Sequence, residues 1–167
     1  GMASIGIPSY RLPKDVLKAE TEDVVRQLGG NFFYGKVLGE AFSVDDLLAN
    51  GYDAVFLGYG ASQGTQLGIR NEDPKLEGYA SGVDFLLKVH QHVEYGEPFA
   101  VTGDVIVVGG GNVAMDCVRS ARRMGAKSVH LVRKGGALDQ PSTWRAGALA
   151  LALVAPSLRS IGQPEVA

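Results

Sequence analysis

The chain has 167 residues, of which 46% are hydrophobic and 20% charged, a composition typical of a globular protein with one domain or two small ones. Its net charge of −2 gives no support to nucleic-acid binding. The longest apolar run, 146–155, has ten residues, too short for a membrane span of roughly 20. The single cysteine, Cys117, excludes an internal disulfide and a cysteine zinc site and predicts a reducing, cytoplasmic compartment.

The two parts of the chain differ in charge. Residues 1–99 carry 8 basic and 14 acidic side chains, a net charge of −6, whereas residues 100–167 carry 8 and 4, a net charge of +4. A basic second part indicates an anionic ligand, although uneven surface charge explains the difference equally well.

The first part contains signals for two helices and two strands. A helix should begin at Pro13 and end at Gly29-Gly30. Proline is tolerated in the first turn because the N–H that it lacks would have no partner within the helix. Ser43 is placed to cap a shorter helix. The predicted elements are a helix over 13–28, a strand over 31–38, a helix over 44–49, a strand over 53–57 and a loop over 63–79.

The second part reads as a strand–helix–strand unit. Ser81 should cap a helix that ends at Gly96, and a linker over 96–103 follows. Strand 104–108, helix 112–124 and strand 128–132 then come in the order of a βαβ unit, which predicts a parallel sheet. Beyond residue 135, alternating leucine and alanine suits either a strand or a helix.

The turn between strand 104–108 and the next helix is rich in glycine. Gly109 permits the sharp turn, Gly111 lets a pyrophosphate approach the backbone, and Ala114 lets helix and strand pack closely. The helix N-terminus supplies free N–H groups for phosphates. This pattern predicts a dinucleotide site, and a purely structural glycine turn is the alternative.

The end of the following strand indicates which dinucleotide binds. A carboxylate there would bind the ribose 2′-hydroxyl of NAD, but the chain has Arg133 and Lys134 and no acid until Asp139. Two cations suit a 2′-phosphate, so we predict NADP. The alternative is a solvated basic loop.

Three segments resemble one known family. The sequences GIPSYRLPKDVL at 6–17, YDAVFL at 52–57 and VIVVGGGNVAMDCVRSARRMGA at 105–126 resemble the small (β) subunit of NADPH-dependent glutamate synthase and related electron-input subunits. The resemblance implies an α/β fold with Rossmann-like parallel sheets, in which two dinucleotide domains bind FAD and NADPH. It also implies that NADPH passes a hydride to FAD and that electrons leave through iron–sulfur centres to a larger partner subunit.

The family motifs map onto residues of this chain. The resemblance places the pyrophosphate of NADPH at the glycine turn, the 2′-phosphate at the paired cations, and FAD near the turn after YDAVFL. The implied cofactor-binding residues are Gly109, Gly110, Gly111, Asn112, Val113, Ala114, Arg133, Lys134, Gly60 and Ala61. No catalytic residue and no metal site is predicted.

The chain also departs from the family pattern. The glycine-rich FAD fingerprint and the cysteine clusters are absent, Tyr59 replaces a threonine, and the resemblance fades after Lys134. We therefore expect part of a larger flavoprotein, with 1–99 as the end of an FAD domain and its connection, and 100–167 as the NAD(P)-binding region. The isolated chain should bind no stable flavin and should self-associate through uncovered apolar faces. A non-catalytic binding or interaction module is the alternative.

Other reactive residues suggest no separate chemistry. Tyr10 and Lys14 have the spacing of a short-chain dehydrogenase pair, but Pro13 between them breaks the helix that such a pair needs. Cys117 is expected to be a small buried hydrophobe. Asp116 could order Arg119, stabilise the start of its helix or touch a ligand, and the sequence leaves these roles open.

Overall fold

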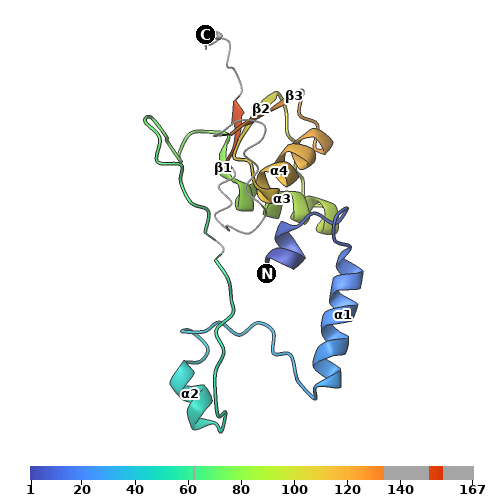
Figure 1. Ribbon diagram of the computed structural model, residues 1–167, viewed down its shortest axis with the longest axis vertical. Coiled ribbons are helices and arrows are strands. Elements are labelled where there is room, and N and C mark those ends of the chain that lie inside the picture. Colours follow the sequence, from blue (N-terminus) through green and yellow to red (C-terminus); the bar gives the residue numbers. More distant parts are fainter. Residues whose placement is uncertain (62, 134–150, 156–167) are drawn as a thin grey trace. The chain divides into compact units, whose positions relative to one another are not determined.

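The chain forms two compact units in the computed structural model, which describes residues 1–61, 63–133 and 151–155 (Figure 1). The first unit comprises Lys14–Ala61, and the second comprises Met2–Pro13 together with the chain from Ser62 onward. The predicted boundary at 99/100 stays a prediction. No helix in the described ranges is long and apolar enough to cross a membrane.

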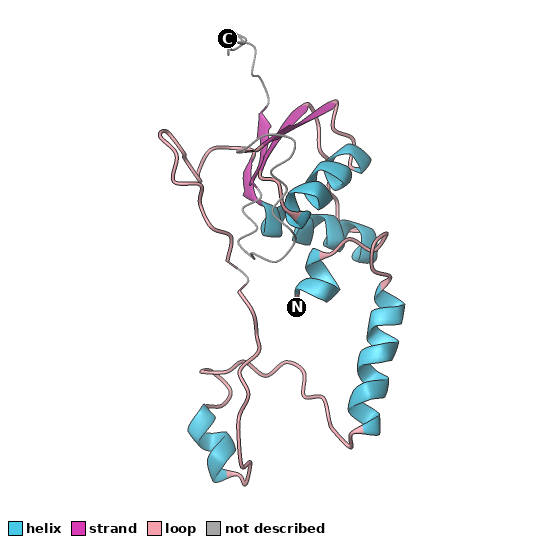
Figure 2. Cartoon of the chain, viewed as in Figure 1, coloured by secondary structure: helices cyan, strands magenta, loops and turns pink. Residues whose placement is uncertain are grey.

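A four-stranded sheet, in the order β1-β4-β2-β3, forms the centre of the second unit (Figure 2). The strands β2 (Asp104–Val108) and β3 (Ser128–Val132) run parallel, as predicted. Between β2 and β1 (Tyr79–Ser81) lies β4 (Leu151–Ala155), antiparallel to both. The parallel pairing predicted from the βαβ unit is therefore confirmed for β2 and β3, whereas the sheet as a whole is mixed, because a strand outside the βαβ unit lies beside β2.

Two helices bury the apolar side of this sheet. Val105 and Val107 on β2 have no exposed surface, as the alternation of a strand with one covered face requires. Helix α4 (Asn112–Arg123) packs against β2 and β3, and α3 (Gly82–Tyr95) packs against α4, β1 and β4. The core that they form consists of Phe85, Leu86, Val89, Val101, Val105, Val107, Ala114, Cys117, Ala121 and Ala126.

Both ends of α3 form as predicted. The Ser81 hydroxyl accepts a hydrogen bond from the Asp84 N–H at 3.1 Å, which satisfies one of the four N–H groups left free in the first turn. Gly96 ends the helix in the left-handed region at φ 71°, a conformation that glycine adopts without strain. Local sequence signals therefore fix the length of α3.

Replacing Ser81 with alanine should lower the free energy of unfolding of the second unit by about 1 kcal/mol, because an N-cap bond is lost. Urea unfolding followed by circular dichroism measures this change. Ser81→Asp, which restores an acceptor at the same position, should recover most of the loss. Equal stability of the alanine variant and the unsubstituted chain would contradict the assignment of this cap.

The first unit has helices but no packed core. Helix α1 (Lys14–Gln27) and helix α2 (Val44–Ala49) form close to the predicted ranges, and a capping box between Ser43 and Asp46 begins α2. The strands predicted over 31–38 and 53–57 are absent. Strands require pairing partners, and within the described part of this unit we find only an isolated bridge between Leu38 and Phe42.

Candidate functional site

The turn from β2 into α4 is built on a glycine that no other residue could easily replace. Gly109 has φ 139°, in a region that side-chain-bearing residues avoid. Its N–H donates to the Val132 carbonyl oxygen at 2.8 Å. This bond fixes the turn against the end of β3, so the carboxyl ends of the two parallel strands lie side by side.

The last glycine of the turn leaves space above the backbone. Gly111 is the N-cap of α4, with φ −84° and ψ −179°, and no side chain caps the helix. A Cβ added at Gly111 would meet no other atom within 4 Å. Gly110, Gly111 and Asn112 are exposed. The first N–H groups of α4 are therefore accessible to an anion, which the helix dipole also favours.

Arg133 reaches the same place from the neighbouring strand. Val108 and Val132 are register partners in the parallel pair, so the residues that follow them come together. A Cβ added at Gly110 would lie 3.5 Å from Arg133 Cδ, which places the half-buried Arg133 side chain against the glycine turn. Lys134, the second predicted cation, lies outside the described residues.

The rest of the predicted site divides between the two units. Ala114 is 1% exposed and faces the core, and Val113 packs against the core from the side, so helix and strand approach closely as the small residue predicts. Gly60 and Ala61 belong to the first unit, where Gly60 is exposed with φ 75°. Their role at a flavin stays a prediction.

Asp116 of α4 has a partner that the sequence did not indicate. Arg11 Nη1 lies 2.7 Å from Asp116 Oδ2, although the two residues are 105 positions apart. The hydrogen bond to Asp116, and then the negative charge of that carboxylate, raise the pKa of Arg11 above its ordinary value. No local spacing signals such a pair, and Arg119 is not the partner found for this carboxylate.

Residues 9–11 all contact α3 or α4. The Ser9 hydroxyl donates to the Glu94 carboxylate on α3, and the Arg123 guanidinium of α4 lies 3.8 Å from the centre of the Tyr10 ring. Together with the Arg11–Asp116 pair, these contacts attach the segment before α1 to the two helices. We call Ser9–Arg11 the anchor segment.

Cys117 is a packing residue, as predicted. It is completely buried, and its thiol lies 3.7 Å from the Gly82 carbonyl oxygen. Burial, with a smaller effect from the charge of Asp116, raises the pKa of Cys117 to about 12. The reactive thiolate is therefore scarce at neutral pH.

Cys117 should not react with a thiol reagent such as dithionitrobenzoate at pH 8 while the chain is folded. Its pKa of about 12 keeps the thiol protonated, and burial blocks access. Absorbance at the wavelength of the released thiolate measures the reaction, and the same sample in concentrated urea provides the fully reactive control. Rapid labelling without denaturant would contradict the buried position.

Comparison with known proteins identifies related chains. No family model matches. The chain is 39% identical over 143 residues to "NADP(+)-dependent formate dehydrogenase subunit beta" of Moorella thermoacetica. This match covers 85% of this chain and 19% of that protein. It is 35% identical over 143 residues to "NADPH-Fe(3+) oxidoreductase subunit beta" of Geobacter sulfurreducens (85% and 20%), and 36% identical over 152 residues to "Glutamate synthase [NADPH] small chain" of Escherichia coli (87% and 31%).

These relatives carry NADP(H)-dependent oxidoreductase names, and the chain spans between 19% and 31% of their lengths. The similarity extends over 85% to 87% of this chain. The resemblance found in the three sequence motifs is thereby confirmed. Over the matched region, the chain is homologous to subunits of the glutamate synthase small-chain type, the group that its three motifs resemble.

Proposed function

We propose that this chain is the NADPH-binding portion of a flavin-dependent oxidoreductase in which NADPH passes a hydride to FAD. The observation that carries the proposal is the open, uncapped glycine turn at the start of α4 with Arg133 against it. An anionic diphosphate suits exposed N–H groups at a helix N-terminus, and a 2′-phosphate suits a guanidinium beside them.

The residues of the turn would have separate tasks. Gly109 would shape the turn, and the main chain of Gly110, Gly111, Asn112 and Val113 would hold the diphosphate. Ala114 would keep α4 close to β2. Arg133, with Lys134, would select NADPH over NADH. NADPH supplies the hydride, and the chain binds and orients it.

The flavin and the electron acceptor are proposed for the whole protein of which this chain would be a part. Gly60 and Ala61 would contact FAD, in a Rossmann-like two-domain arrangement with residues 1–99 on the flavin side and 100–167 on the NADPH side. The formate dehydrogenase and iron reductase relatives are named as β subunits. By analogy, a larger subunit would receive the electrons.

Titration of the chain with NADPH and NADH, followed by calorimetry, tests the proposal. NADPH should bind more tightly than NADH. Arg133→Ala should weaken NADPH binding by about tenfold through loss of a charge-assisted contact, with little effect on NADH binding. Lys127→Ala is the matched control, because it removes an equal charge just before β3 begins, at the opposite end of that strand.

Two outcomes would contradict the proposal. Equal binding of both nucleotides, unchanged in Arg133→Ala, would remove Arg133 from the 2′-phosphate. If neither NADPH nor NADH binds, the result would favour the alternative of a non-catalytic module that retains the fold. Neither outcome depends on a bound flavin, so the test applies to the chain as it is.

A further inference from the structure

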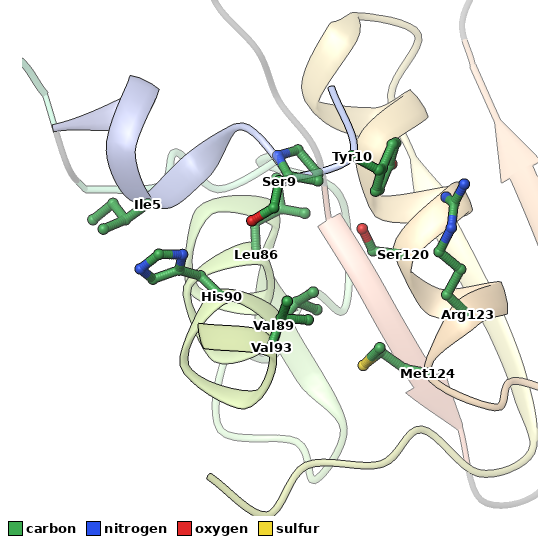
Figure 3. Close-up of a pocket in the computed structure, with 11 residues that line it drawn as sticks. Ile5, Ser9, Tyr10, Leu86, Val89, His90, Val93, Ser120, Arg123 and Met124 are labelled. Atoms are coloured by element: carbon green, nitrogen blue, oxygen red, sulfur yellow. The ribbon is translucent and has the colours of Figure 1, made fainter. Parts of the chain in front are cut away.

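We propose that a second pocket of this chain, separate from the glycine turn, binds a small monocarboxylate with an apolar body. The pocket has a volume of about 230 Å³ and lies between the N-terminal residues, α3 and the C-terminal half of α4 (Figure 3). All of its lining residues belong to the second unit. Its apolar walls are Ile5, Pro8, Leu86, Val89, Val93 and Met124.

The pocket has the size of a small molecule. At about 30 Å³ for each water, its volume corresponds to about eight water molecules, and small ligands typically occupy concave, mainly apolar sites with a few placed polar groups. Two such polar groups, Ser120 and Arg123, come from α4. They are three residues apart, so they lie next to each other on one face of the helix.

Ser120 has an unmet hydrogen-bonding requirement. Its side chain is 1% exposed, and its hydroxyl has no partner in the structure. Figure 3 shows the Ser120 side chain on the side of α4 that faces the pocket and α3. A buried hydroxyl without a partner destabilises a fold, so an oxygen atom of a ligand that accepts from Ser120 would remove this penalty.

Arg123 makes the polar end of the pocket positive. Its guanidinium lies over the Tyr10 ring, and Nη1 donates to the Arg119 carbonyl oxygen at 3.5 Å. A guanidinium has five N–H donors, so others at the edge of its plane can donate to a ligand. No aspartate or glutamate is among the lining residues. Of the acids nearby, Glu94 accepts from Ser9, and Asp116 pairs with Arg11 through Oδ2, while its buried Oδ1 has no partner.

The chemistry of the two ends defines the ligand. Two donors, one of them cationic, favour a carboxylate, and the aliphatic walls favour a short hydrocarbon chain. Hexanoate, with about eight non-hydrogen atoms, matches the volume and is the probe of choice. Hexanol has the chain without the charge, and acetate has the charge without the chain.

Calorimetric titration of the whole chain provides the test. Hexanoate should bind with a Kd near one millimolar, as expected for a ligand of this size, and hexanol and acetate should each bind about tenfold more weakly. Binding of hexanol as tight as that of hexanoate would overturn the choice of a carboxylate. Absence of hexanoate binding at ten times the expected Kd would overturn the site itself.

Four variants distinguish this pocket from nonspecific binding. Arg123→Gln and Ser120→Ala should each weaken the binding of hexanoate by about tenfold. Ser120→Ala should keep or raise the midpoint of thermal unfolding, because it removes the unpaired hydroxyl. Val93→Trp fills the pocket from a position that is 54% exposed and should abolish binding. Arg119→Gln makes an equal charge change at an exposed position of α4 and should leave the affinity for hexanoate unchanged. Unaltered hexanoate affinity in Arg123→Gln and Val93→Trp would overturn the proposal.

Discussion

Replacing Gly111 with valine should abolish NADPH binding while the chain stays folded. The backbone at Gly111 is extended (φ −84°, ψ −179°), and an added Cβ meets no atom within 4 Å, so the fold offers no steric resistance. The space that the side chain would enter is the space that we assign to the diphosphate. We expect NADPH affinity to fall by about a hundredfold or more, with the free energy of unfolding reduced by less than about 1 kcal/mol.

Two further variants make this test specific. Gly111→Ala adds only the Cβ and should reduce the affinity for NADPH, but by less than Gly111→Val does. Gly109→Ala introduces a side chain at φ 139° and should destabilise the fold by about 1–3 kcal/mol, so that any loss of binding follows unfolding. If Gly111→Val binds NADPH as well as the unsubstituted chain does, the diphosphate cannot lie against this turn.

The elements that the sequence predicted correctly are those whose signals are local. The cap at Ser81 and the stop at Gly96 lie within or beside α3 itself, and the short helix α2 begins at its own capping box. The β2–α4–β3 unit could also be predicted from neighbouring segments. Two apolar runs of strand length lie on either side of a helix that has small residues on one face. Each of these features depends on residues a few positions apart.

Strand pairing was predicted less well, because it depends on distant segments. Residues 31–38 and 53–57 have β-forming composition but form no strand pair within the described part of the first unit. Strand β1, which begins at the last residue of the predicted loop 63–79, forms because β4 supplies its partner. The direction of β4 could not be derived from an alternation of leucine and alanine, since the same pattern fits a strand that runs either way.

The candidate site shows the same division. The glycine turn and Arg133 could be placed together from the sequence, because parallel strands end at the same edge of a sheet. The anchor segment Ser9–Arg11 could not, because its partners Glu94, Arg123 and Asp116 lie far along the chain. A buried aspartate such as Asp116 indicates that a partner is required but does not say which of the 16 basic residues provides it.

Replacing Arg11 with glutamine should be the most destabilising change in the anchor segment. The Asp116 side chain is 5% exposed, and its Oδ1 already lacks a hydrogen-bond partner, so loss of Arg11 removes the hydrogen bond to its other oxygen as well. An uncompensated buried charge costs several kcal/mol. Because the Arg11 side chain is 37% exposed, we expect about 2–3 kcal/mol in the free energy of unfolding at pH 7, measured by urea denaturation.

Removing the other member of the pair should cost less. Asp116→Asn leaves a neutral amide whose oxygen still accepts from Arg11, and Arg11 itself can reach water. An equal cost for both variants would mean that Arg11 stabilises the anchor segment through packing of its aliphatic chain and that its charge contributes little.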